Sequence, residues 1–474
     1  MMKAFFNNLS YQQWALIFIV LLFVLRLVGI THPPLEVNHH WRQVTGLMVA
    51  RNFAEGQTDF FHPKIDEVGV GTHVSSGVIG MEFPLLNGLI AAVSSVMGYD
   101  HWYGRLINLI VSSLGLWFFF LIIKRYWNDR FAFYATAILG TSIWFAFSRK
   151  TMPDTFSISI AFFSIYFLKK FLDESRGIHL FGYIILSALA LLTKIPSAVI
   201  LSVVPLMIYF STISLRKKWL LMTVSALPVA AAVFWYFVWN VTIAKESGMW
   251  YNVGEEIPKG WHLFIQELGT VSKHFYFSTL MSYVALAALV AGFIFMILKK
   301  EKTLQLSAGV ISIFFILFAL KSGRHFVFQH YYMIPIAPVF SLIAAFALVQ
   351  LQRHWLAMVL LVSISIESIA NQQHDFRIHQ RNLYKLELEG ILDGLGAKRE
   401  DLIVINGEGN PQELYLSHRK GWTCVSTELN DIEYLNALEE AGAKYVVVKP
   451  NEWVETVPLT LVFENDHYRI YRFK

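Results

Sequence analysis

The sequence predicts an all-α polytopic membrane protein that ends in a small α/β domain. Of its 474 residues, 55% are hydrophobic and only 15% are charged, and the mean hydropathy of +0.48 is too high for an ordinary soluble protein. Continuous apolar runs recur, each able to cross a hydrocarbon core about 30 Å thick as a helix of about 20 residues. Because the runs are continuous and not alternating, they predict helices and exclude a transmembrane barrel.

The apolar runs predict about eleven spans, with the N-terminus in the cytoplasm. The first run lacks a small-residue cleavage site, so we expect an uncleaved span. In chain order the predicted spans cover residues 11–30, 102–123, 131–147, 155–171, 178–192, 195–210, 219–241, 275–298, 304–320, 331–351 and 355–370.

The apolar stretch 78–97 is ambiguous, because it could cross the membrane or lie along its surface. Short cytoplasmic loops collect Lys and Arg, and this rule distinguishes the two topologies. If residues 78–97 do not cross, nearly every basic cluster falls on the cytoplasmic side; these clusters are at 124–130, 169–176, 216–218, 299–302 and 353–354. We therefore predict a juxtamembrane or re-entrant helix over 78–97. The net charge of +5 is then explained by Lys and Arg in short cytoplasmic loops, which set the orientation of the chain in the membrane. We therefore do not expect nucleic acid as a partner.

The composition changes near residue 371, which divides the chain into a transmembrane domain (1–370) and a soluble C-terminal domain (371–474). Strands are predicted at 401–406, 444–449 and 468–473, with an amphipathic helix at 431–443. The topology places this α/β domain outside the cytoplasm. The single cysteine, Cys424, excludes an intrachain disulfide and a Cys-rich metal site.

Charged and imidazole side chains crowd into the first extracytoplasmic loop, residues 31–105, with its juxtamembrane helices. Glycosyl transfer from a lipid phosphate needs a base for the acceptor hydroxyl and cations for the phosphate leaving group. It also needs an apolar groove for the lipid, which a bundle of spans supplies. The candidates for the base are Glu82, Glu36, Asp66, His39 and His40. The candidates for binding the donor phosphate or substrate are Arg42, Gln43, Arg105, Arg149, Asp154, Lys194, His330, Tyr331 and Tyr332.

Several short motifs occur in one order along residues 31–351. They are His40-Trp41-Arg42-Gln43, Glu82-Phe83-Pro84-Leu85, Gly104-Arg105-Leu106, Met152-Pro153-Asp154, Lys194-Ile195-Pro196 and His330-Tyr331-Tyr332. This set resembles the GT-C superfamily of membrane glycosyltransferases, on the branch of the protein O-mannosyltransferases (PMT) and the ArnT-like lipid A aminoarabinose transferases.

The resemblance implies a GT-C-like fold and an inverting glycosyltransferase that uses a polyprenyl-phosphate sugar. Its acceptor would be an envelope glycolipid, polysaccharide or protein, at the outer face of a bacterial inner membrane. The sequence departs from the family in one respect. Where the family carries an acid in the first loop, this chain has His39-His40 and Val44-Thr45, so the identity of the base stays open.

No cofactor is certain from the sequence, and a divalent metal is a possibility that it does not settle. His39 and His40 are adjacent, so on one helix their side chains point apart and a shared metal is disfavoured. Four of the candidates could also have a purely structural role. Glu82 could be an acid at a helix N-terminus and Asp154 a helix cap, while Arg42 and Arg105 could be cations that snorkel to the membrane surface.

Two other functions fit a polytopic membrane protein. A transporter or lipid flippase would carry ionisable groups near the bilayer midplane and two similar halves, neither of which is evident here. An assembly or binding protein would have residues 371–474 as its working part.

Overall fold

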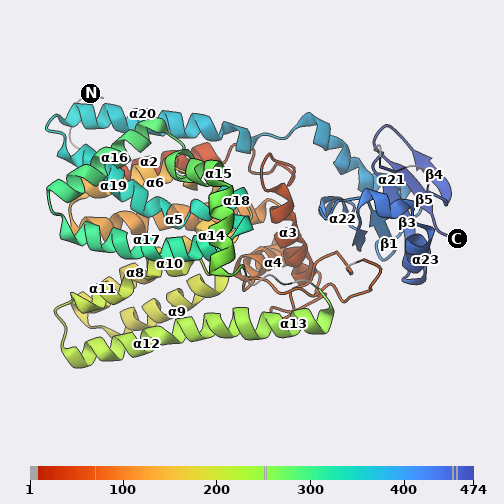
Figure 1. Cartoon of the computed structure of the whole chain (residues 1–474), viewed down its shortest axis with the longest axis horizontal. Helices are drawn as coiled ribbons and strands as arrows, with labels where there is room; N and C mark the ends of the chain where they lie inside the picture. The colour runs from red at the N-terminus through yellow and green to blue at the C-terminus, as the bar shows by residue number, and fades with distance from the viewer. Residues whose placement is uncertain (1–8, 70, 250, 252–253, 451–452, 455–456) are drawn as a thin grey trace. The chain divides into compact units, whose positions relative to one another are not determined.

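The computed structural model describes residues 9–474 except 70, 250, 252–253, 451–452 and 455–456 (Figure 1). The chain forms two compact units. The helical unit comprises Met1–Ile30, Arg105–Trp235 and Val253–Phe376, and the sheet unit comprises Thr31–Gly104, Tyr236–Asn252 and Arg377–Lys474. These units cut the chain differently from the predicted boundary at residue 370, because the first loop is compact with the C-terminal sheet.

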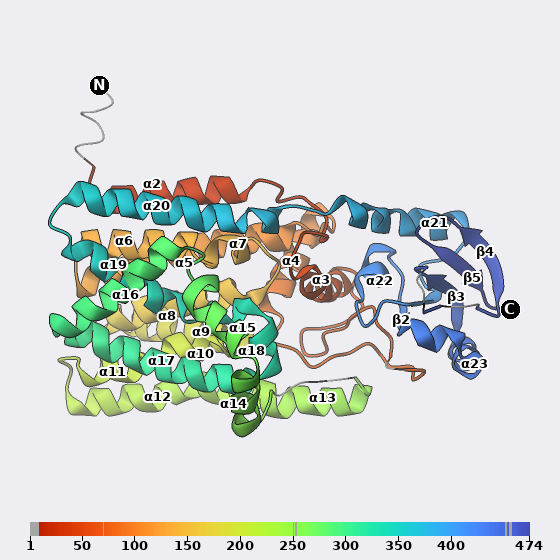
Figure 2. The same ribbon diagram turned by 45° about the horizontal axis from the view of Figure 1, so that its top comes forward.

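The helical unit is a bundle whose main helices run alongside one another in both ribbon views (Figure 2). Its helices are α2 (Tyr11–Arg26), α5 (Tyr103–Tyr126), α6 (Asp129–Thr141), α7 (Trp144–Phe147), α8 (Pro153–Glu174), α9 (Gly177–Thr193), α10 (Ser197–Leu201), α11 (Val204–Tyr209), α12 (Leu215–Val233), α14 (Ile257–Gln266), α15 (Leu268–Lys273), α16 (Tyr283–Leu298), α17 (Lys302–Ser322), α18 (Arg324–Phe328), α19 (Ala337–Gln350) and α20 (His354–Gln372). Shorter segments are the π-helix η2 (His274–Ser278) and the 3-10 helices η3 (His330–Met333) and η4 (Gln373–Phe376). The π-helix η1 (Phe234–Trp239) begins in the helical unit and ends in the sheet unit.

Within the described residues, five helices are long and apolar enough to cross a membrane, and a sixth span is possible if one bent pair counts as a single span. The bent pair is Leu268–Ser278 with Tyr283–Leu298, at 88°. The five are Tyr103–Tyr126, Pro153–Glu174, Leu215–Ser247, Lys302–Ser322 and His354–Phe376. The chain is therefore mostly helical, with several helices suited to a multi-pass membrane protein, while the number of about eleven spans stays a prediction.

Several predicted spans are interrupted in the structure. Residues 195–210 form α10 and α11 instead of one helix, and Pro205 lies at the start of α11. Proline lacks the N–H that would continue the hydrogen-bond ladder, which explains the break. Residues 131–147 likewise divide into α6 and α7, and 331–351 begins with the 3-10 turn η3.

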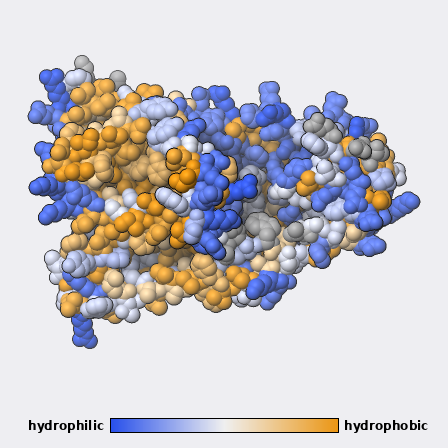
Figure 3. Space-filling model, viewed as in Figure 1, coloured by the Kyte–Doolittle hydropathy of each residue, from blue (hydrophilic) through white to orange (hydrophobic). Residues whose placement is uncertain are grey.

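The outer surface of the bundle is apolar, as lipid contact requires. On α17, for example, Ile313 and Phe314 are 59% and 48% exposed, whereas Phe315 is buried. Hydrophobic side chains cover much of the visible face of these helices (Figure 3). Since an aqueous surface rarely shows contiguous apolar patches of this size, the bundle surface fits a bilayer.

The prediction of a helix over 78–97 is correct only for its second part. Helix α4 spans Leu85–Met97 and begins directly after Pro84. Val78 instead forms an antiparallel bridge with Lys64. The residue before a proline is disfavoured in helical conformation, so Pro84 sets the start of the helix.

The sheet unit contains a five-stranded mixed sheet in the order β2-β1-β3-β5-β4. Strand β1 pairs in parallel with β2 and β3, while β5 pairs antiparallel with β3 and β4. The strands are β1 (Leu402–Ile405), β2 (Gly421–Thr423), β3 (Ala443–Val448), β4 (Thr460–Glu464) and β5 (Arg469–Arg472); the helices are α3 (His40–Ala54), α4, α13 (Asn240–Ser247), α21 (Leu388–Gly394), α22 (Gln412–Leu416) and α23 (Ile432–Glu440). The three predicted strands and the predicted helix at 431–443 are confirmed, as β1, β3, β5 and α23. Strands β2 and β4 were not predicted.

Helix α3 of the first loop belongs to the core of the sheet unit. Its residues Val44 and Leu47 share a hydrophobic cluster with Ile403 and Ile405 of β1 and with Val447 of β3. Positions 43–52 of α3 are all buried. Burial on all sides explains why the helix shows little amphipathic pattern in the sequence.

Candidate functional site

Two side chains predicted to act together form a buried ion pair in the helical unit. The Nζ of Lys194 lies 2.8 Å from a carboxylate oxygen of Asp154, and both side chains are largely buried. Asp154 lies in the first turn of α8, and Lys194 directly follows the last residue of α9. Within the described part of the chain, the other carboxylate oxygen of Asp154 has no hydrogen-bond partner. A buried acceptor with unused capacity is a suitable contact for a substrate hydroxyl.

An aromatic bridge links this pair to a second one. The Lys194 ammonium lies 5.2 Å from the ring centre of Tyr331, and the Tyr331 ring lies 5.9 Å from Phe147. Phe147 in turn lies under the ammonium of Lys150, at 5.3 Å. Lys150 pairs with Asp375 at 2.8 Å, and both side chains are almost fully buried. Two cations and two carboxylates are thus held around two aromatic rings, an arrangement that we call the bundle cluster.

The turn before α8 is held in place by Asn108 of α5. Its side-chain amide donates to the carbonyls of Phe147, Lys150 and Met152, at 3.2, 2.8 and 3.2 Å. Sequence reasoning missed Asn108 because an amide inside an apolar helix has no charge to attract attention. It also missed Asp375, although an acid shortly after an apolar run was a usable signal.

Two further predicted cations of the helical unit are buried. Arg105 is 1% exposed and donates to the carbonyl of Ile30 at 3.3 Å. The Arg149 guanidinium lies 4.2 Å from the ring centre of Phe376, and its side chain is also 1% exposed. Burial removes the snorkelling explanation for both residues, since a snorkelling side chain places its charge in water.

His330 and Tyr332 flank Tyr331 in turn η3. The His330 ring packs edge-on against Phe147, with 5.3 Å between ring centres. Loss of hydration lowers the pKa of His330 to about 4, so its imidazole is neutral at neutral pH. Tyr332 stacks on Phe318 at 5.7 Å.

In the sheet unit, the structure pairs two residues that the sequence singled out separately. Arg42 of α3 forms an ion pair with Glu82, which precedes α4. Both side chains are partly buried, with exposed fractions of 18% and 16%. Asn240 donates to the carbonyl of Met81 at 2.7 Å and so fixes the backbone beside Glu82. This carboxylate is oriented by an arginine and stays partly accessible, as a general base must be.

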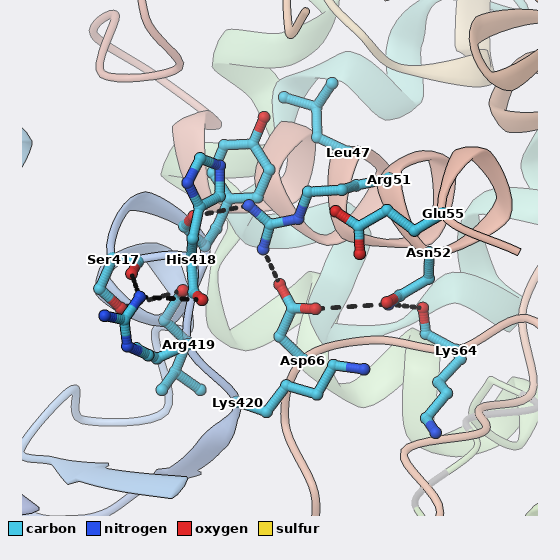
Figure 4. Close-up of polar contacts among 12 residues, drawn as sticks. Leu47, Arg51, Asn52, Glu55, Lys64, Asp66, Ser417, His418, Arg419 and Lys420 are labelled. Atoms are coloured by element: carbon cyan, nitrogen blue, oxygen red, sulfur yellow. Dashed lines mark hydrogen bonds and ion pairs between the residues drawn. The ribbon is translucent and has the colours of Figure 1, made fainter. Parts of the chain in front are cut away.

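Asp66 has a different environment (Figure 4). Its carboxylate accepts from Arg51 at 2.5 Å and from Asn52 at 3.3 Å. The same guanidinium donates to the carbonyl of Tyr415 at 3.0 Å and lies 4.6 Å from that residue's ring centre. Asp66 is 1% exposed. This arrangement connects α3 to the C-terminal part of the sheet unit and gives Asp66 a structural role.

The remaining candidates of the first loop lie around the start of α3. Glu36 is fully buried in a stretch that pairs with Ile378, and His32 lies 3.7 Å from its carboxylate. His39 precedes α3 in the left-handed conformation, with φ of 57°, and His40 is the first helical residue. Gln43 is buried. Across the described residues, no three His, Cys, Asp or Glu side chains are grouped so that they could hold a metal ion.

Comparison with known proteins agrees with this architecture. Residues 82–239 match the family described as dolichyl-phosphate-mannose-protein mannosyltransferase. The chain also resembles the crystal structure of ArnT from Cupriavidus metallidurans in the apo state, with a TM-score of 0.65, 12% identity and 97% of each chain covered. The chain therefore has a fold similar to that of ArnT, and its residues 82–239 resemble the mannosyltransferase family.

Two more structures resemble this chain. ArnT from Cupriavidus metallidurans bound to undecaprenyl phosphate has a TM-score of 0.63 at 11% identity, with 98% of each chain covered. The other is the archaeal oligosaccharyltransferase AglB from Archaeoglobus fulgidus, in complex with an inhibitory peptide and a dolichol-phosphate. Its TM-score is 0.57 at 13% identity, and the alignment covers 92% of this chain and 69% of the AglB chain. No curated protein sequence matches the chain.

The matched family region contains many of the residues that the structure pairs. Glu82, Arg105, Arg149, Asp154 and Lys194 fall inside residues 82–239. Arg42, the partner of Glu82, precedes that region, and Tyr331 and Asp375 follow it. The ion pairs Arg42–Glu82 and Lys150–Asp375 each include one residue outside the matched region, so only the geometry shows them.

Proposed function

We propose that this protein is a membrane glycosyltransferase that moves a sugar from a polyprenyl-phosphate donor to an envelope acceptor. The observation that carries the proposal is the buried Asp154–Lys194 pair beside Tyr331 in a chain with the ArnT fold. Two of the similar structures were solved with undecaprenyl phosphate or a dolichol-phosphate bound, and this chemistry suits a site rich in buried cations.

The donor phosphate is assigned to the helical unit. When the glycosidic bond breaks, negative charge builds on the departing phosphate, and cations in a poorly hydrated site stabilise that charge strongly. Lys194 and Lys150 of the bundle cluster, with the buried Arg105 and Arg149 of the same unit, are the cations proposed for this task. Asp154 keeps Lys194 in place and offers its second oxygen to a hydroxyl of the donor sugar.

Glu82 is the proposed base. It takes the proton from an acceptor hydroxyl while the hydroxyl oxygen attacks the anomeric carbon, and the carbon–oxygen bond to the phosphate breaks. Attack from the face opposite the phosphate inverts the anomeric configuration. Arg42 holds the Glu82 carboxylate in position. Asp66 and Glu36 suit this role less well, because both are fully buried within the sheet unit.

The acceptor is assigned to a pocket of the sheet unit with a volume of about 360 Å³. Its lining includes Trp41 of α3, the carboxylates of Glu67 and Glu428, and Tyr434 of α23. Burial raises the pKa of Glu67, whose carboxylate accepts from the Thr423 hydroxyl at 2.6 Å. Aromatic faces with carboxylate acceptors bind the apolar faces and hydroxyls of sugars, which favours a hydroxyl-rich acceptor. The proposed location is the outer face of a bacterial inner membrane.

Transfer of labelled sugar from polyprenyl-phosphate donors, measured with the purified protein in lipid nanodiscs, tests the proposal. Lys194→Met should lower the rate by about 10²- to 10³-fold, because a stabilising charge at the leaving group is lost. Lys217→Met, at an exposed lysine of α12, is the matched control and should leave the rate unchanged. Wild-type rates in Lys194→Met would contradict the assignment. Movement of intact donor across the bilayer without transfer would favour the flippase.

A further inference from the structure

The helical unit contains a large apolar cavity that the proposed chemistry does not use. Its volume is about 620 Å³, and it lies between α5, α8, α10, α11, α17 and α19. The wall is formed mainly by hydrophobic side chains, among them Phe119, Ile123, Ile165, Met207, Leu304 and Ala308. A water-filled cavity would need polar partners for its waters, so this wall favours a hydrocarbon occupant.

The cavity belongs to the opposite end of α8 from the Asp154–Lys194 pair. Lys169 and Asp173, which line it, are 15 and 19 residues beyond Asp154 in the same helix. At 1.5 Å per residue they lie about 22 and 28 Å along the axis. The cavity is therefore distinct from the bundle cluster.

The polar residues among its lining make one end of the cavity basic. Lys169 and Arg125 both pair with Asp173, at 2.5 Å each, so two cations share one carboxylate. Lys302 also lines the cavity and is exposed. Before it come the exposed residues Lys299 and Lys300 and the acid Glu301, which accepts from the Trp127 indole at 3.3 Å. Tyr126 and Trp127 line the same end. Aromatic rings beside lysines at the end of a span are typical of the level of the lipid headgroups.

We propose that this cavity binds one acyl chain of an anionic glycerophospholipid, whose headgroup phosphate contacts Lys302 and Lys169. The apolar wall suits the chain, and the excess of cations at the mouth suits the negative headgroup. The tail of the polyprenyl donor fits less well, because its phosphate is assigned to the other end of α8 and its far end carries no charge. The choice of a glycerophospholipid over the donor tail rests on the proposed position of the donor phosphate, whereas the cavity and its basic mouth do not depend on glycosyl transfer.

Photocrosslinking tests the site directly. The wild-type protein is placed in phosphatidylcholine nanodiscs with a trace of phosphatidylglycerol that carries a diazirine in one acyl chain, and labelled residues are mapped by mass spectrometry. A phosphatidylcholine probe with the same chain is the reference. We expect labels at cavity residues such as Leu304 and Ala308, with about fivefold preference for the anionic probe, as one lysine contact near a membrane surface provides.

Two matched pairs of variants distinguish labelling inside the cavity from labelling on the lipid-exposed surface of the bundle. Lys302→Glu should abolish the preference for the anionic probe, whereas Lys299→Glu changes the net charge equally and should preserve it. Ser307→Trp should fill the cavity and remove its labels; Ile313→Trp adds the same bulk on the exposed side of α17 and should keep them.

Equal labelling by both probes, unaffected by Lys302→Glu, would overturn the proposal. So would a polyprenyl-phosphate probe that labels the same residues and is not displaced by phosphatidylglycerol, because the donor tail would then be the occupant. If Ser307→Trp does not fold, the pair of lysine variants still decides. Sugar transfer is measured separately, so failure of either proposal is distinguishable from failure of the other.

Discussion

Lys194 and Asp154 come from the adjoining ends of two packed helices and form an ion pair of 2.8 Å inside the bundle. Asp154 lies in the first turn of α8, where a carboxylate is also favoured by the helix dipole. Lys194 follows α9 and precedes Pro196, which prevents the helix from continuing. The pair can thus have a structural role, a catalytic role or both.

Removing one partner of this pair should destabilise the protein. Lys194→Met leaves Asp154 as an uncompensated buried charge, which costs about 3–5 kcal/mol. The double variant Asp154→Asn/Lys194→Met carries no charge and should recover most of the thermal unfolding midpoint measured in detergent. If the pair also binds the donor, sugar transfer should stay lost in the double variant. Recovery of both stability and transfer would show that the pair is only structural.

The Glu82→Gln variant should lose activity and keep its fold. An amide cannot accept the proton of the acceptor hydroxyl, so we expect kcat to fall by about 10²- to 10⁴-fold with little change in KM. Asp59→Asn, an exposed acid of the same loop, is the matched control and should have wild-type kinetics. A Glu82→Gln enzyme with normal kcat would exclude Glu82 as the base.

Asp66→Asn should lower stability more than it lowers catalysis. The change leaves the buried guanidinium of Arg51 without its carboxylate, with an expected loss of about 3–5 kcal/mol. Limited proteolysis should then cut the sheet unit earlier than in the wild type, while the transfer rate per folded molecule stays close to normal. If instead transfer disappeared in a protein of unchanged stability, Asp66 would return as a catalytic candidate.

His330 should make stability depend on pH. Its pKa is about 4 in the folded protein and near the ordinary value of about 6.5 in the unfolded chain. As pH falls from about 6.5 to about 4, the unfolded chain therefore gains a proton that the folded protein does not, and stability decreases. His330→Gln should show a smaller drop in unfolding midpoint between pH 7.5 and pH 5 than the wild type. An equal drop in both proteins would contradict this.

Local sequence patterns predicted much of the fold. The long apolar runs correspond to α5, α8, α12, α17 and α20, because hydrophobicity over about 20 residues is a local property of the chain. Strands β1 and β3 were found from their short hydrophobic runs, and β5 from its alternating pattern. Strand β2, with three residues, and the exposed edge strand β4 give too weak a signal.

The candidate site could be predicted only as a set of residues. Glu82 and Arg42 were both selected from motifs, but nothing in the sequence indicated that they pair across 40 positions. From the sequence, Asp66 and Glu82 were both candidates for the base, and only the contacts of Asp66 with Arg51 and Asn52 distinguish them. Asp375 was not selected, and only the structure shows that it pairs with Lys150, 225 positions away.

The sequence by itself determined that this is a polytopic helical protein with a small α/β domain, and it determined which residue types are available for chemistry. Composition and periodicity suffice for this, since they act over one turn or one span. Only the tertiary structure decided which acid faces which cation and that α3 lies in the core of the sheet unit. Those outcomes depend on packing between segments far apart in the chain, where the burial of a charge is tolerated only beside a partner.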